Sequence, residues 1–205
     1  MRTLILMSCL IVGVSASSAR AEWTQFRGPT GQGFVDAAIP LHWGETQNVT
    51  WKTPLDGKAW SSPVVLNGQI WMTTAVANEP TADQIEKQLK ASGLTKRQFK
   101  QRQVHGTLTL STICVDETSG KVLHNIGLFD IESPEAIHTT NSYASPTPVL
   151  EKGRVYCHFG SNGTACINTA NGKVEWIRKV AVDFSVGAGS SPVIYSNSLV
   201  LVCDG

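Results

Sequence analysis

Four side chains that could recognise a small ligand lie near one another in the 205-residue chain: His138, Asn141, Tyr143 and His158. Imidazole, amide and phenol groups supply the hydrogen bonds that orient a small molecule or a carbohydrate on a protein surface. The same groups also satisfy the backbone of tight turns, because buried polar groups are hydrogen-bonded as a rule. We treat these four residues as ligand-facing candidates, with a turn network as the interpretation that the sequence favours.

No catalytic constellation can be read from the spacing of the other polar residues. Neither a Ser-His-Asp arrangement nor a carboxylate pair stands out, and solvation accounts for the cluster of Asp130, Glu132 and Glu135. The sequence contains no Cys-x-x-Cys motif and no pair of histidines at ligand spacing. It therefore predicts no metal site.

Two cysteines, Cys157 and Cys166, flank a Gly-Ser-Asn-Gly stretch that should form a turn between two strands. A turn at 161–162 would place the two thiols opposite each other, whereas a turn at 162–163 would set Cys157 against Asn168. An oxidising compartment would permit a disulfide between them. Because the two registers conflict, free buried thiols are favoured, and the Cys157–Cys166 bridge is the alternative.

Residues 1–21 have the features of a secretory signal peptide. Arg2 gives a short basic start, an apolar stretch follows, and Ala-Arg-Ala at 19–21 is a small-x-small cleavage site. We therefore expect export to a periplasm or to the outside of the cell, and no further stretch predicts a membrane span. Without Arg2 and Arg20, the 17 basic residues become 15, against 16 acidic ones. This near-neutral balance gives no support for nucleic-acid binding.

A repeated strand pattern follows an irregular, glycine-rich segment at 22–48. Similar phrases occur three times: Ser-Ser-Pro-Val-Val at 61–65, Ser-Pro-Thr-Pro-Val at 145–149 and Ser-Ser-Pro-Val-Ile at 190–194. Pro148 and Pro192 are 44 residues apart, which is typical of one four-stranded blade of a β-propeller. We predict an all-β fold over 49–205, a β-propeller of antiparallel blades with two blades and part of a third present. The segment 49–53 is predicted to be an outer strand of a last blade, and further residues are expected to complete the ring.

An insertion at 78–105 separates the first two phrases. Two Thr-x-x-Gln capping boxes, at 81–84 and 95–98, predict two short helices. Ile85 and Leu89 are one helical turn apart and are expected to form a buried stripe. Six basic residues also fall in the insertion. A solvated helical face is the favoured interpretation, and a docking surface for an acidic partner is the alternative.

One nine-residue phrase occurs twice, 52 residues apart. The first copy, Cys-Val-Asp-Glu-Thr-Ser-Gly-Lys-Val, begins at Cys114, and the second, Cys-Ile-Asn-Thr-Ala-Asn-Gly-Lys-Val, begins at Cys166. Self-similarity at such a period is typical of repeat architectures, in which each unit packs on its neighbours.

The two copies resemble the tryptophan-docking motif, A-x-D-x-x-x-G-K-x-x-W, of the PQQ-like β-propeller repeat family. Stretches at 141–149 and 158–165 are similar to secreted members of that family from planctomycete bacteria. The resemblance implies structural docking roles for Asp116, Gly120 and Lys121 in the first copy and for Asn168, Gly172, Lys173 and Trp176 in the second. The first copy has His124 in the position of the tryptophan. In this motif the glycine takes a left-handed backbone conformation and the indole covers the neighbouring blade.

The resemblance implies two functions of different classes. The first is an exported, non-catalytic propeller that acts as an interaction or scaffold module for a protein partner and needs no cofactor. The alternative is a quinoprotein dehydrogenase that oxidises alcohols or sugars with PQQ and calcium. Such enzymes often carry two adjacent cysteines, and no two cysteines of this chain are adjacent. The non-catalytic module is therefore the main expectation.

Overall fold

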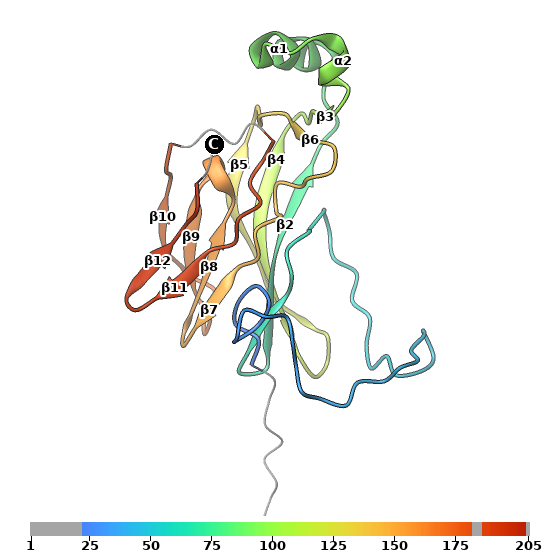
Figure 1. Cartoon of the computed structure of the whole chain (residues 1–205), viewed down its shortest axis with the longest axis vertical. Helices are drawn as coiled ribbons and strands as arrows, with labels where there is room; N and C mark the ends of the chain where they lie inside the picture. Colours follow the sequence, from blue (N-terminus) through green and yellow to red (C-terminus); the bar gives the residue numbers. More distant parts are fainter. Residues whose placement is uncertain (1–21, 182–185, 204–205) are drawn as a thin grey trace, which may run out of the picture.

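The computed structural model describes residues 22–181 and 186–203, so the predicted signal peptide at 1–21 lies outside the described residues. Antiparallel β-sheets dominate the structure, which confirms the predicted all-β class (Figure 1). Two sheets have four strands each, and a hairpin and a small ribbon have two strands each. Within the described ranges, no helix is long and apolar enough to cross a bilayer.

The first sheet is an antiparallel meander in the order β1-β2-β4-β5. Its strands are β1 (Val64–Leu66), β2 (Gln69–Ala77), β4 (Leu108–Asp116) and β5 (Val122–Ile131). Asn67 and Gly68 join β1 to β2 with positive φ angles of 54° and 78°, as a tight hairpin turn requires. β2 and β4 pair along all nine of their residues. The first sheet is therefore a four-stranded antiparallel unit that begins at the first proline phrase.

The second sheet repeats this plan in the order β7-β8-β9-β10. Its strands are β7 (Val149–Glu151), β8 (Arg154–His158), β9 (Thr164–Asn168) and β10 (Val174–Arg178). A hairpin of β11 (Val193–Tyr195) and β12 (Ser198–Val200) follows. Pro63, Pro148 and Pro192 each directly precede the first strand of their sheet, where a missing N–H donor is tolerated. The three similar phrases thus occupy equivalent positions.

One hydrophobic core joins the two large sheets. Trp71 and Leu110 enter it from the first sheet, and Val155, Cys157 and Ile167 enter it from the second; each is 0% exposed. Val155 and Cys157 are two residues apart on β8, so they point to the same face of the sheet. Burying an apolar side chain of this size contributes about 1.5–3 kcal/mol. The seam between the sheets is therefore a major source of stability.

The insertion leaves the first sheet between β2 and β4. It carries α1 (Ala82–Ser92), α2 (Lys96–Phe99) and β3 (Arg102–Gln103), and β3 pairs with β6 (Ile137–His138). Both capping boxes are confirmed: Thr81 and Thr95 each accept a hydrogen bond from the backbone N–H of the glutamine three residues later. Gly93 ends α1 with a left-handed φ of 63°. Local sequence therefore sets the ends of both helices.

The predicted buried stripe on α1 is wrong. No residue of α1 is buried, and Ile85 keeps 42% of its surface exposed. The helix projects beyond the ends of the strands, so no sheet lies under its apolar side (Figure 1). A polar contact ties it to the rest of the protein, because Gln88 Nε2 donates to the carbonyl of Pro134 at 2.8 Å.

The described segment 49–53 carries no strand, in contrast to the prediction. A strand needs a backbone ladder with a neighbour, and this segment contacts the first sheet through side chains instead. Trp51 Nε1 donates to the carbonyl of Glu117 at 3.0 Å, and Thr53 Oγ1 donates to the carbonyl of Gly120 at 2.5 Å. The segment therefore docks on the first sheet without extending it.

Residues 22–48 are irregular apart from isolated bridges. Trp23 exchanges two backbone hydrogen bonds with Val65 on β1, at 2.9 and 2.8 Å. Its indole also covers Gly28, which has a φ of 74°, and a Cβ added there would lie 2.7 Å from the ring. An aromatic ring over a left-handed glycine is thus one of the contacts that fasten this segment.

Candidate functional site

A cavity of about 350 Å³ opens where loops from the two large sheets meet. Its lining comes from the loop before β1 (Gly57, Lys58), the end of β2 (Ala75, Val76, Ala77), the base of the insertion (Glu79, Gln103, His105) and the turn before β7 (Asn141, Ser142, Tyr143). We call it the loop cavity. Its volume lies in the range of small-molecule sites.

Hydrogen bonds hold the walls of the loop cavity in place. Lys58 and Ala75 exchange two backbone hydrogen bonds, at 2.9 and 3.0 Å. Gln103 Nε2 donates to the carbonyl of Asn141 at 2.6 Å and to that of His138 at 3.1 Å. The loop before β1 is therefore tied to β2, and the base of the insertion is tied to the turn before β7, which lowers the ordering cost of binding.

Two of the four ligand-facing candidates, Asn141 and Tyr143, line the loop cavity, but their polar atoms already have partners. Asn141 Nδ2 donates to the carbonyl of Val186 at 3.0 Å, and its Oδ1 accepts from Ser145 Oγ at 2.6 Å. Tyr143 Oη donates to the carbonyl of Glu135 at 2.5 Å. These are the contacts of a turn network. The two residues shape the cavity, and direct ligand binding by them stays a prediction.

The structure does not bring the other two candidates into the loop cavity. His138 lies on β6, with its Nδ1 2.7 Å from Thr140 Oγ1. His158 is 2% exposed, and its Nδ1 lies 2.8 Å from Thr164 Oγ1. Its Nε2 has no hydrogen-bond partner in the part of the chain that the structure describes. Burial lowers the pKa of His158, so the imidazole is neutral at pH 7.

Lys58, Glu79 and His105 supply the titratable groups of the loop cavity, and none of them was a candidate from sequence. Within the described residues, the side chains of Lys58 and Glu79 make no hydrogen bond and no ion pair. His105 packs edge-on against Tyr143, with ring centroids 5.7 Å apart. Burial lowers the pKa of His105, the charge of Lys58 adds to this effect, and Glu79 opposes it. The imidazole is therefore neutral at pH 7 and offers one donor and one acceptor.

Cys157 and Cys166 are free thiols. Cys157 pairs with Ala165 and Cys166 pairs with Tyr156, so the two side chains point to opposite faces of the sheet. A short 3₁₀ turn, η1 (Gly160–Asn162), connects the strands, and both registers predicted from the sequence are wrong. Burial raises the pKa of Cys157 to about 12 and that of Cys166 to about 11. Both groups therefore stay protonated at neutral pH.

The repeated phrase forms two turns with the same backbone, which we call the first glycine corner (116–121) and the second glycine corner (168–173). Their shared residues are Asp116, Gly120 and Lys121 in the first and Asn168, Gly172 and Lys173 in the second. Both glycines have a φ of 70°. In each corner the carbonyl of the lysine accepts the N–H of the acid or amide residue, at 2.9 and 2.8 Å respectively. Their contacts are those of packing and turn formation.

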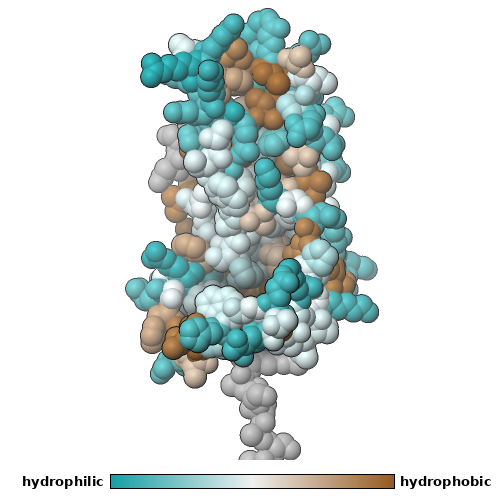
Figure 2. Space-filling view, turned by 90° about the vertical axis from the view of Figure 1, so that its right-hand side faces the viewer, coloured by the Kyte–Doolittle hydropathy of each residue, from teal (hydrophilic) through white to brown (hydrophobic). Residues whose placement is uncertain are grey.

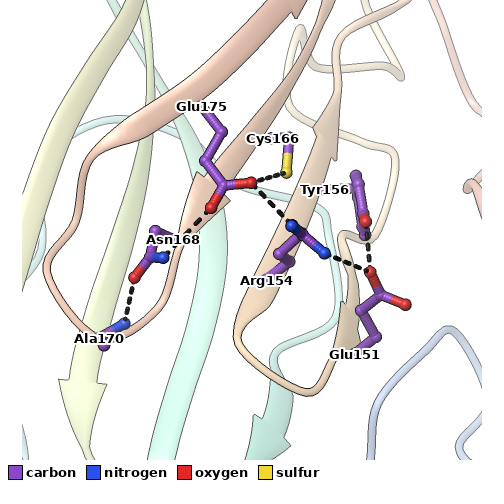
Figure 3. Close-up of polar contacts among 7 residues, drawn as sticks. All are labelled: Glu151, Arg154, Tyr156, Cys166, Asn168, Ala170 and Glu175. Carbon is purple, nitrogen blue, oxygen red and sulfur yellow. Dashed lines mark hydrogen bonds and ion pairs between the residues drawn. The ribbon is translucent and has the colours of Figure 1, made fainter.

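A chain of paired polar groups lies on the second sheet (Figure 3), and Trp176 on β10 packs beside it. The ring of Trp176 is 5.9 Å from that of Tyr156, and both line a cavity of about 230 Å³ beside the β11–β12 hairpin. Arg154 Nε lies 2.7 Å from Glu175 Oε2, and Tyr156 Oη donates to Glu151. Ion pairs as exposed as this one contribute little to stability, because water screens the two charges. The network therefore organises the surface of the second sheet.

The insertion at 78–105, which we call the helical arm, concentrates positive charge. Its basic residues are Lys87, Lys90, Lys96, Arg97, Lys100 and Arg102, and its acidic residues are Glu79, Asp83 and Glu86. The rest of the chain after residue 21 has nine basic and 13 acidic residues. Hydrophilic groups cover most of this end of the molecule, around a small hydrophobic patch (Figure 2). The arm therefore differs in charge from the sheets that carry it.

No protein-family model matches the chain, and no curated protein matches it significantly. The resemblance to PQQ-like repeats therefore stays a prediction. Within residues 22–181 and 186–203, no three His, Cys, Asp or Glu side chains are placed to hold a metal ion.

The donors that line the loop cavity do not fit PQQ with calcium. Calcium takes about six to eight oxygen ligands, often several carboxylates, whereas Glu79 is the one carboxylate among the lining residues. The quinone itself carries several carboxylates, and Lys58 is the one cationic side chain that faces the cavity. We therefore derive no catalytic step through these groups.

Proposed function

We propose that the protein is an exported, non-catalytic interaction module built from β-propeller blades, and that its helical arm docks a protein partner. Three proline phrases at equivalent positions and two sheets with the same strand order support the propeller architecture. The paired glycine corners support repeated units that pack side by side.

The observation that carries the proposal is a helix with well-defined ends and no buried residue. α1 has 11 residues, a capping box at its start, a left-handed glycine at its end and no buried residue. Isolated helices shorter than about 12–15 residues are marginal in water, and this helix contributes no core. A docking surface gives a reason for keeping such an element well ordered at both ends.

The charge and the apolar surface of the helical arm indicate which kind of partner it would bind. Six basic and three acidic residues give it a positive balance, and Ile85 and the half-buried Leu89 form an apolar strip on α1. An amphipathic helix of this kind fits a partner with an apolar groove or helix bordered by acidic residues. The charges would steer association and the apolar strip would provide most of the contact energy.

Site-specific photo-crosslinking tests the proposal. A photoreactive amino acid at Ile85, in the protein exposed to the secreted and envelope fraction of its native host, should capture one protein partner. The same group at Ile177, which is 39% exposed on β10, should not capture it. Lys87→Glu with Lys90→Glu should weaken capture roughly fivefold or more, while Lys152→Glu with Arg178→Glu, which changes the charge equally, should not. Equal capture from both positions, or no effect of arm charge, would contradict the proposal.

A second assay separates the module from the quinoprotein dehydrogenase. The protein would be mixed with PQQ and calcium and tested for a bound-quinone spectrum and for dye-linked oxidation of alcohols and sugars. We expect no saturable turnover, because the loop cavity lacks the required donor set. Saturable turnover would replace the proposed function with the enzymatic one.

A further inference from the structure

The loop cavity carries two opposite charges that the protein does not pair with each other. Lys58 comes from the loop before β1, and Glu79 comes from the base of the helical arm. Both act electrostatically on His105, which lies in the same cavity. Both side chains are exposed to solvent, and within the described residues neither has a hydrogen-bond or ion-pair partner.

We propose that the loop cavity binds a small zwitterion, an α-amino acid or a dipeptide with a free ammonium and a free carboxylate. Lys58 receives the carboxylate and Glu79 receives the ammonium. A ligand that carries both groups can pair with both side chains, whereas a ligand with a single charge can pair with only one of them.

The remaining walls suit such a ligand. Ala75, Val76 and Ala77 give an apolar side that can take a short aliphatic side chain. His105 offers a neutral imidazole to a peptide amide. A volume of about 350 Å³ is at the small end of the range for ligand sites, so one or two residues fit and a long peptide does not.

The cavity is also built before the ligand arrives. The backbone pairing of Lys58 with Ala75 and the contact of Gln103 with Asn141 join its four walls in two pairs. Tyr143 is 7% exposed and packs against His105, so the imidazole has a fixed support. Preorganised walls lower the entropic cost of binding a small flexible molecule.

The inference does not depend on the proposed docking role, because Lys58 lies outside the helical arm and Glu79 lies at the base of the arm, before α1. Calorimetric titration of the full chain tests it with Ala-Ala, N-acetyl-Ala-Ala and Ala-Ala-amide. We expect Ala-Ala to bind at least about fivefold more tightly than either blocked form. Binding of all three with equal affinity, or saturable binding of none, would overturn the proposal.

Two variants give a crossed pattern that a general structural defect cannot produce. Lys58→Met should bring Ala-Ala down to the affinity of Ala-Ala-amide while keeping the preference against the acetylated form. Glu79→Gln should bring Ala-Ala down to the affinity of N-acetyl-Ala-Ala while keeping the preference over Ala-Ala-amide. Lys152→Met and Glu132→Gln, exposed residues outside the cavity, are the matched controls and should bind like the unmodified chain. Circular dichroism would verify the fold of each variant, and equal losses for all three ligands in both variants would count against the assignment.

Discussion

The two glycine corners have the same backbone but are covered by different side chains. At the first corner, the indole of Trp51 lies over Gly120, where an added Cβ would come within 2.5 Å of the ring. The indole N–H also donates to the carbonyl of Glu117 at 3.0 Å. One residue therefore supplies both the apolar cover and the hydrogen bond.

At the second corner three side chains share these tasks. His124 lies over Gly172, where an added Cβ would be 2.9 Å from Nδ1. Gln69 Nε2 donates at 3.1 Å to the carbonyl of Thr169, the counterpart of Glu117. Trp71 stacks on His124 with ring centroids 5.9 Å apart, and its Nε1 donates to Gln69 Oε1 at 3.2 Å. His124, which stands in the position of the motif's tryptophan, therefore still covers the glycine of the next unit.

The difference shows what the corner requires of its neighbour. The left-handed glycine leaves a flat surface that a ring can cover closely, and the carbonyl three residues before it needs a donor. Either requirement can be met by any nearby side chain with the right shape or N–H group. At the first corner one residue supplies both the ring over the glycine and the donor to the carbonyl three residues before it, whereas at the second corner a cluster shares these two contacts.

The largest expected effect is that of removing the concentrated contact. Trp51→Ala should lower the free energy of unfolding by about 3 kcal/mol, the low end for tryptophan because the ring is half-buried. His124→Ala should cost about 1 kcal/mol, since Trp71 and Gln69 stay in place. Urea unfolding monitored by circular dichroism measures both values. Equal losses of unfolding free energy in the two variants would show that the two corners do not differ in this way.

Alanine at each corner glycine gives the next largest effect. Both glycines have a φ of 70°, and a non-glycine residue there costs about 1–2 kcal/mol. Gly120→Ala should cost about 2–3 kcal/mol in total, because the new Cβ meets three atoms of the Trp51 ring within 2.8 Å. Gly172→Ala should stay near the backbone cost, since its Cβ meets the smaller ring of His124. The same unfolding experiment would show a reversed order if the second corner were the tighter one.

Double-mutant cycles sharpen the distinction between concentrated and distributed cover. Trp71→Phe and His124→Ala should be coupled by about 1 kcal/mol, because the two rings stack on each other. Trp51→Ala and His124→Ala belong to different corners and should add within about 0.5 kcal/mol. Additivity of the first pair would show that the stacked rings do not act as a unit.

The smallest expected effect is a pH dependence located in the second sheet. Burial lowers the pKa of His158 in the folded protein, so the unfolded chain binds a proton more readily and folding stability is lost as pH falls through the unfolded value of about 6.5. Between pH 7 and 6 the loss is at most about 0.7 kcal/mol. Thermal unfolding across this range should show a shallower pH slope for His158→Gln than for the unmodified chain. The exposed His42 provides the control, and an equal change of slope for His42→Gln would exclude His158 as the source.

Much of the fold could be predicted because its signals are local. The proline phrases mark the starts of β1, β7 and β11, and the two capping boxes mark the helices. Each signal depends on residues only a few positions apart, whose preferred backbone angles and hydrogen bonds are nearly independent of the rest of the chain. The strand at 49–53 and the buried stripe on α1 failed, since each needed a partner surface that lies elsewhere.

The candidate site was harder to predict. Asn141 and Tyr143 were singled out and do line the loop cavity, but their polar atoms serve the turn. Lys58, Glu79 and His105 come from separate loops. No spacing within any one segment marks them as neighbours, because their proximity follows from the pairing of β2 with β4 and from the position of the turn before β7.

The sequence by itself determined where the proline phrases start their strands, the helix caps and the two left-handed glycines, because local sterics and short-range hydrogen bonds are strong enough to choose them. The tertiary structure alone decided which ring covers each glycine, which faces the thiols of Cys157 and Cys166 occupy, and that Lys58 and Glu79 share a cavity. These outcomes depend on contacts between residues far apart in the chain. Their energies are settled only when the two sheets pack together.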